Sequence, residues 1–191
     1  MKINLEYKAV IKSLKYISAI LIILSIIEFL FIALLNITKI TIDTESNFLI
    51  AIILSPDYFQ FPGIIFYIFN ILSIFMFMVL GMYLLNVVIN EKIQTNGLAK
   101  LLVVIGMVIV LNAFVKMNYL ILLGKSKIET FSGTIRFQTA IYNPDISPFS
   151  LTIFWFYFLS INCFLMIIGA IIATAGIKWT ILITEEQKQT V

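Results

Sequence analysis

Four long apolar runs constrain the fold of this chain more than any other feature of its 191 residues. Each is at least as long as the roughly 18 residues that mark a membrane-spanning helix. Backbone amides and carbonyls inside a bilayer must be paired within their own segment, which favours α-helices. We therefore predict an all-α integral membrane protein whose single domain is a bundle of four transmembrane helices. The predicted spans cover about residues 16–35, 62–89, 98–124 and 149–177.

The composition supports the same class of protein. Hydrophobic residues make up 61% of the chain and charged residues 12%, whereas about 25% of the residues of a soluble domain are charged. The many isoleucines and lysines are typical of an AT-rich prokaryotic genome. We expect a multi-pass protein of the cell membrane, surrounded by the lipid bilayer.

The distribution of lysine and arginine predicts the orientation of the bundle, because cytoplasmic loops are enriched in both residues. Eight lie on the side that holds both termini and the short loop 90–97, and four lie on the side of the longer loops 36–61 and 125–148. We therefore predict that both termini are cytoplasmic and that the two longer loops lie on the outer side. The short inner loop makes spans two and three antiparallel neighbours.

The two outer loops contain stretches that favour β-strands. Residues 37–43 alternate in the manner of a strand, and the apolar run 48–54 is too short to cross a bilayer. In the second loop, two β-prone runs flank Ser132 and Gly133, which predicts a hairpin. One face of its second strand would carry Ile135, Phe137, Thr139 and Ile141.

Together the loops are predicted to form a small β cap, and irregular loops packed on the helix ends are the alternative. The two halves of the chain share this layout, but no tandem repeat is evident. The triplet Asn36-Ile37-Thr38 matches the acceptor pattern for N-glycosylation. Because it adjoins a predicted span, we do not expect it to be modified.

Polar side chains occur at similar depths in all four predicted spans. Glu28 lies seven residues before the outer end of span one, and Lys116 lies eight before the outer end of span three. At a rise of 1.5 Å per residue, both lie about 10–12 Å below the outer boundary. Asn70 is at the same level, and Asn112 and Asn162 are deeper. Since an unpaired charge in hydrocarbon is costly, we predict an ion pair between Glu28 and Lys116, flanked by the amides.

Three interpretations of this polar layer remain open. The pair and the amides would fix helix register and partner choice. Alternatively, they would form a binding or proton-relay site that opens to the outer side. In the third interpretation, Glu28 or Lys116 meets a group on another subunit.

Span four also carries small residues at helical spacing, namely Gly169, Ala173 and Gly176. Small residues at this spacing let two helix backbones approach closely. The partner is either another span of this chain or another protein, and the sequence does not distinguish them.

Catalytic and cofactor chemistry finds little support in the sequence. Histidine is absent and Cys163 is the single cysteine, so neither a Ser-His-Asp triad nor an internal disulfide can form. Phosphate-binding glycine motifs, metal-ligand spacings and basic patches with interleaved aromatics are also missing. We expect no enzyme activity, no metal, no cofactor and no binding of nucleotide or nucleic acid.

The sequence therefore predicts a non-catalytic polytopic membrane protein, an accessory or scaffold subunit of a larger membrane complex. Its expected partners are other membrane protein subunits. The alternative is a small transporter or channel component that uses Glu28 and Lys116 as an intramembrane polar site.

Overall fold

The computed structural model describes residues 2–42, 45–55, 63–89, 96–130 and 133–189. The predicted helix start at Pro62, most of the predicted inner loop and the predicted turn residue Ser132 lie outside these ranges. The elements follow one another as α1 (Lys2–Ile37), β1 (Lys39–Ile42), β2 (Glu45–Phe48), α2 (Leu49–Leu54), α3 (Gly63–Ile89), α4 (Asn96–Lys125), β3 (Lys127–Thr130), β4 (Gly133–Arg136), α5 (Phe137–Tyr142) and α6 (Phe149–Gln189).

Four helices in the described part of the chain are long and apolar enough to cross a membrane: α1, α3, α4 and α6. They indicate a multi-pass membrane protein, as the sequence predicts. Two helices extend beyond the predicted spans: α1 begins at Lys2, before Tyr16, and α6 continues beyond Ile177 to Gln189. The length of an apolar run reflects the thickness of the hydrocarbon core of the bilayer. A helix can extend past that core, because its backbone hydrogen bonds form within the helix itself.

The chain divides into two compact units, and each long helix contributes a segment to both. Unit 1 comprises Met1–Ile26, Phe75–Ala113 and Phe164–Val191, and unit 2 comprises Ile27–Ile74 and Phe114–Cys163. In unit 1, each of the four helix segments buries an apolar stripe at intervals of three and four residues, the spacing of one helix face. Examples are Leu14, Ile17 and Leu21 on α1 and Leu102, Ile105 and Ile109 on α4.

Small residues bring α4 and α6 into close contact within unit 1. A methyl group on Gly106 would lie 2.5 Å from the backbone nitrogen of Ala173 and 2.5 Å from the carbonyl oxygen of Gly169. A methyl group on Gly176 would lie 2.8 Å from the carbonyl oxygen of Ala99. The small residues predicted on span four therefore face another span of the same chain.

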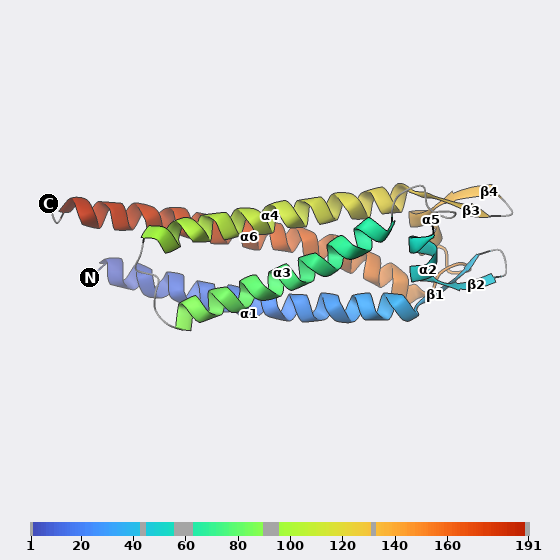
Figure 1. Ribbon diagram of the computed structural model, residues 1–191, viewed down its shortest axis with the longest axis horizontal. Coiled ribbons are helices and arrows are strands. Elements are labelled where there is room, and N and C mark those ends of the chain that lie inside the picture. The colour runs from blue at the N-terminus through green and yellow to red at the C-terminus, as the bar shows by residue number, and fades with distance from the viewer. Residues whose placement is uncertain (1, 43–44, 56–62, 90–95, 131–132, 190–191) are drawn as a thin grey trace. The chain divides into compact units, whose positions relative to one another are not determined.

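Two antiparallel hairpins and two short helices gather at one end of the helices of unit 2 (Figure 1), which we call the hairpin end. Strand β1 pairs with β2 from Lys39↔Phe48 to Ile42↔Glu45, and β3 pairs with β4 from Lys127↔Arg136 to Thr130↔Gly133. Gly133 has φ of 126°, a conformation that favours glycine.

The strand predicted through residues 135–141 is wrong beyond Arg136. Phe137, Thr139 and Ile141 lie in α5, which buries Phe137, Ala140 and Ile141. Within the apolar run 48–54, which is too short to span, Leu49–Leu54 form α2, and this helix buries Leu49, Ile52 and Ile53. Both sets have the spacing i, i+3, i+4 of a helix face, rather than the alternation of a strand.

The elements of the first half of the chain recur in the same order 88 residues later, in the second half. Glu28 and Lys116 are separated by the same number of residues. Strands β1 and β2 correspond to β3 and β4, and α2 corresponds to α5, with identical lengths. The candidate spans Ala9–Ile37 and Gly97–Lys125 also correspond at both ends. The structure therefore contains an internal repeat that the sequence does not reveal by inspection.

The packing follows the same correspondence. Gly81 packs against Ser18 and Ile22 of α1, and its equivalent Gly169 packs against Gly106 and Val110 of α4. Many equivalent positions are buried in both halves. They include Leu14/Leu102, Ile17/Ile105, Leu21/Ile109, Ile32/Leu120, Ile40/Ile128, Leu49/Phe137, Ile53/Ile141, Asn70/Phe158, Phe77/Leu165 and Leu84/Ile172.

In unit 2 the two halves are related by a pseudo-two-fold axis. The rings of Phe31 and Tyr157 lie 4.3 Å apart between α1 and α6. Their equivalents, Tyr119 and Phe69, lie 5.6 Å apart between α4 and α3. Reciprocal contacts of this kind define an isologous interface, as in a symmetric dimer.

We predict that Gly106→Ala separates α4 from α6 in unit 1. The added methyl group meets backbone atoms that have no rotamer to change, and overpacking of this kind costs about 1–3 kcal/mol of the free energy of unfolding. The measurement is thermal or denaturant unfolding of the purified protein in detergent. Gly97→Ala is the control, because a methyl group there meets nothing within 4 Å. Equal stability of both variants would contradict the close approach.

Candidate functional site

A buried ion pair joins α1 to α4 in unit 2. Lys116 Nζ donates a hydrogen bond to Glu28 Oε2 at 2.6 Å, and the two side chains are 0% and 1% exposed. Each residue lies on the buried stripe of its helix, between Ser25 and Ile32 on α1 and between Ala113 and Leu120 on α4. The two charges predicted at one depth are therefore in direct contact.

The immediate surroundings of the pair are aromatic. Lys116 Nζ lies 6.0 Å from the centre of the Phe158 ring, where the negative face of the ring attracts a cation. Phe31, one turn after Glu28, packs against Phe154, Tyr157 and Phe158 of α6. No described residue donates a hydrogen bond to Glu28 Oε1. Aromatic side chains of α6, among them the tyrosine Tyr157, thus pack beside the pair.

Glu28 and Lys116 are equivalent positions of the internal repeat. Two equivalent residues that touch each other lie next to the pseudo-two-fold axis. With identical residues in both halves, this position would bring two like charges together inside an apolar bundle. The chain carries opposite charges there, so the contact is attractive.

Two of the predicted amide neighbours, Asn70 and Asn162, make hydrogen bonds within their own helices and none to the pair. Asn70 and Asn162 donate to backbone carbonyls of their own helices, to Phe66 O at 2.8 Å and to Phe158 O at 2.6 Å. The Oδ1 atoms of both amides are buried, and no described residue donates to them. Asn112 is half-buried and belongs to unit 1. The charged pair is therefore separate in its hydrogen bonding from Asn70 and Asn162.

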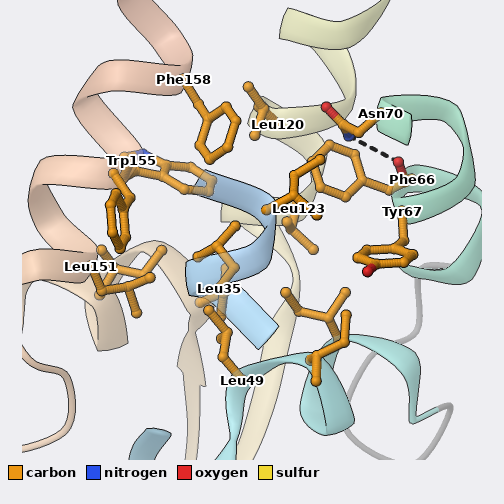
Figure 2. Close-up of a pocket in the computed structure, with 16 residues that line it drawn as sticks. Leu35, Leu49, Phe66, Tyr67, Asn70, Leu120, Leu123, Leu151, Trp155 and Phe158 are labelled. Carbon is orange, nitrogen blue, oxygen red and sulfur yellow. Dashed lines mark hydrogen bonds between the residues drawn. The ribbon is translucent and has the colours of Figure 1, made fainter. Parts of the chain in front are cut away.

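A cavity of about 50 Å³ lies near the hairpin end of unit 2 (Figure 2). Helices α1, α3, α4 and α6 form its walls, and the short helices α2 and α5 also line it. Neither Glu28 nor Lys116 is among its lining residues, which are Ile32, Leu35, Leu49, Ile50, Ile53, Phe66, Tyr67, Asn70, Leu120, Leu123, Phe137, Ile141, Leu151, Phe154, Trp155 and Phe158.

The sequence does not predict this cavity. Of the lining residues, only Asn70 is among the predicted site residues, because the others are apolar or aromatic residues in apolar runs. The signal that would have found them is the 88-residue repeat, which pairs Ile32 with Leu120, Leu35 with Leu123 and Asn70 with Phe158. The cavity therefore lies between the two halves, at their pseudo-two-fold axis.

No protein-family model matches this chain, and no curated protein or solved structure is similar to it. Within the described residues, no three side chains of His, Cys, Asp or Glu are grouped as a metal site would require. The chemistry that the described site offers is one closed ion pair and one cavity with an almost wholly apolar surface.

We predict that Glu28→Gln and Lys116→Met each lower the stability of the folded protein. Removing one partner of a buried pair leaves an uncompensated charge, which costs about 3–5 kcal/mol. The double variant should recover part of this loss, and unfolding in detergent measures the four free energies. Lys100→Met is the matched control, since Lys100 lies on the same helix and is exposed. Additive losses in the double variant would argue against an energetic coupling.

Exchanging the two charges tests their equivalence under the repeat. Glu28→Lys alone or Lys116→Glu alone places like charges in contact and should destabilise the protein more than Glu28→Gln or Lys116→Met does. The exchanged double variant restores an attractive pair in nearly equivalent surroundings, so most of the folded yield should return. A double variant no better than its worse single parent would show that the two positions are not interchangeable.

Proposed function

We propose that this protein is a non-catalytic subunit of a larger membrane assembly. The observation that carries the proposal is the closed Glu28–Lys116 pair, in which both charges are buried and each is the partner of the other. A transport or relay group needs access to solvent or substrate, and these two side chains have almost none. The pair instead supports a structural role, in which it fixes the register of α1 against α4.

The proposed contact with a partner is the exposed face of α6 in unit 1. Ile167, Ala170, Ile171 and Thr174 are exposed on this face. Thr174 Oγ1 donates to Ala170 O at 2.6 Å, so its hydroxyl is satisfied within its own helix. Small side chains four residues apart allow a second helix to approach closely in lipid. The other small stripe of α6, around Gly169, is already occupied by α4.

The proposed orientation places both termini in the cytoplasm and the hairpin end outside the cell membrane. It is supported by eight lysines on the side of the termini against four basic residues on the side of the hairpins. In this orientation, the hairpins form an outer cap over the helices of unit 2.

We expect the Ala170→Leu variant to lose its partner while it keeps its own fold. The larger side chain blocks the close approach of a second helix. Overpacking of this kind costs about 1–3 kcal/mol, which lowers the association constant roughly 5- to 150-fold. The measurement is the size of the complex in a gentle detergent extract of the native membrane. Ile167→Leu, a change of shape on the same face, is the control and should leave the complex intact. A wild-type protein that purifies as a stable monomer and moves solute in liposomes would refute the subunit proposal.

Thiol labelling tests the orientation. In a Cys163→Ser background, a membrane-impermeant maleimide should label Thr41→Cys in intact cells and spare Thr184→Cys. Both positions are exposed, one in β1 and the other near the end of α6. Labelling of Thr184→Cys alone would reverse the orientation.

A further inference from the structure

Two cations lie directly opposite each other in the second hairpin, formed by β3 and β4 (Figure 1). Lys127 on β3 is the partner of Arg136 on β4, and both side chains are exposed. Phe137 N donates to Ser126 O at 2.8 Å, so the next pair along the ladder, Lys127 with Arg136, is a non-hydrogen-bonded pair. Side chains lie closest at such a pair, with Cβ atoms about 4.5–5.5 Å apart. Like charges in this arrangement repel each other and destabilise the hairpin.

The first hairpin, formed by β1 and β2, has a different pair at the equivalent positions of the repeat. Lys39 is the equivalent of Lys127, and its partner Phe48 is the equivalent of Arg136. Lys39 Nζ lies 4.9 Å from the centre of the Phe48 ring, which is a favourable cation–π contact. The second hairpin therefore has a repulsive pair where the first has an attractive one.

The charges around the two pairs differ in the same direction. Residues 125–136 contain three basic residues and one acidic residue, whereas the equivalent residues 37–48 contain one basic and two acidic residues. The third basic residue of the second half is Lys125, the last residue of α4, and its side chain is exposed. Among the described side chains, no carboxylate forms an ion pair with Lys125, Lys127 or Arg136. An anion from outside the chain would therefore relieve the repulsion.

The position of the three cations restricts the chemical class of that anion. Lys125 ends the candidate membrane span Gly97–Lys125, and Leu122, one turn earlier on α4, is 48% exposed. Lysines at the end of a span lay their stems along apolar surface and extend the ammonium group to the level of the lipid headgroups. Phosphate is the anion at that level, and the planar guanidinium of arginine binds it with two hydrogen bonds. A phospholipid supplies this phosphate together with an acyl chain that can lie against Leu122.

We propose that Lys127 and Arg136 bind the phosphate of an anionic phospholipid in the leaflet at the hairpin end. Arg136 donates two hydrogen bonds to phosphate oxygens, and the ammonium groups of Lys127 and Lys125 attract the same charge. The phosphate lies between two cations that otherwise repel each other, so the bound lipid stabilises the hairpin. An uncharged glycerol headgroup is compatible with three cations, whereas the quaternary ammonium of a choline headgroup is repelled by them.

The test compares three ligands, added to the full-length protein in an uncharged detergent. They are dioleoylphosphatidylglycerol, dioleoylphosphatidylcholine and inorganic phosphate. The measurement is the shift in Tm as a function of ligand concentration, from which the apparent affinity follows. We expect phosphatidylglycerol to bind about fivefold more tightly than phosphatidylcholine, and inorganic phosphate at equal concentration to give no shift, because it has no acyl chain. Equal shifts for the two lipids, or an equal shift for inorganic phosphate, would overturn the proposal.

Two variants assign the binding to the second hairpin. Arg136→Gln and Lys127→Gln should each weaken the binding of phosphatidylglycerol about fivefold. Lys39→Gln is the matched control, because Lys39 is the exposed equivalent of Lys127 in the first hairpin and the variant has the same net charge. It should leave the affinity unchanged. A loss of the same size in Lys39→Gln would mean that the lipid responds to net charge alone, and the proposed site would be wrong.

Arg136→Phe gives the second hairpin the pair that the first hairpin has. Without lipid, this variant should have a higher Tm than the wild type, because a cation–π contact replaces a repulsive one. With saturating phosphatidylglycerol the order should reverse, because only the wild type retains the guanidinium that binds the phosphate. The same order of Tm values with and without the lipid would contradict the proposal.

Lys127→Glu keeps the test decisive if Arg136→Phe fails to fold. The new carboxylate lies opposite Arg136 and forms an attractive cross-strand pair, so the hairpin is stabilised without lipid. Phosphatidylglycerol should then no longer raise the Tm, because the guanidinium is already paired and the added charge repels the phosphate. Stabilisation by phosphatidylglycerol that survives in Lys127→Glu would place the lipid elsewhere and refute the site.

Discussion

A charge cannot remain unpaired inside an apolar bundle, and the Glu28–Lys116 contact answers this constraint. Lys116 Nζ lies 2.6 Å from Glu28 Oε2, although 88 residues separate the two positions in the chain. Separating the two side chains would leave both charges buried and unpaired, which is costly. The pair therefore favours a register of α1 and α4 in unit 2 in which the two side chains meet. The aromatic packing of Phe31 against α6 lies one turn from that pair.

The same contact shows how two halves with the same order of elements differ in their polar residues. Apolar positions are interchangeable between the halves, as Leu21 and Ile109 or Phe77 and Leu165 illustrate. Polar positions are not, because Glu28 faces Lys116 and Asn70 corresponds to Phe158. Tyr67 with Asn36 in one half becomes Trp155 with Gly124 in the other. Several of these residues, among them Asn70, Phe158, Tyr67 and Trp155, line the cavity.

Much of the fold could be predicted because backbone groups in hydrocarbon must be hydrogen-bonded within the protein, which favours α-helices. The four spans and the matching depths of Glu28 and Lys116 follow from apolar length and from a rise of 1.5 Å per residue. The repeat could not be recognised in the same way. Different apolar residues are equally stable in lipid, so equivalent positions of the two halves are both buried but are often occupied by different residues. Helix α5 was predicted as a strand because Phe137, Thr139 and Ile141 alternate with other residues, and only packing selects the helical face.

The sequence by itself determined that this is a membrane protein of four apolar helices and that two opposite charges lie at one depth. Both properties follow from the composition of each segment and from the positions of residues within it, which can be read directly from the sequence. Only the tertiary structure decided that Glu28 touches Lys116, that Gly106 packs on Gly169, and that Asn70 and Trp155 share a cavity. These are distances between segments far apart in the chain, and they arise from how side chains of different helices fill the space between them.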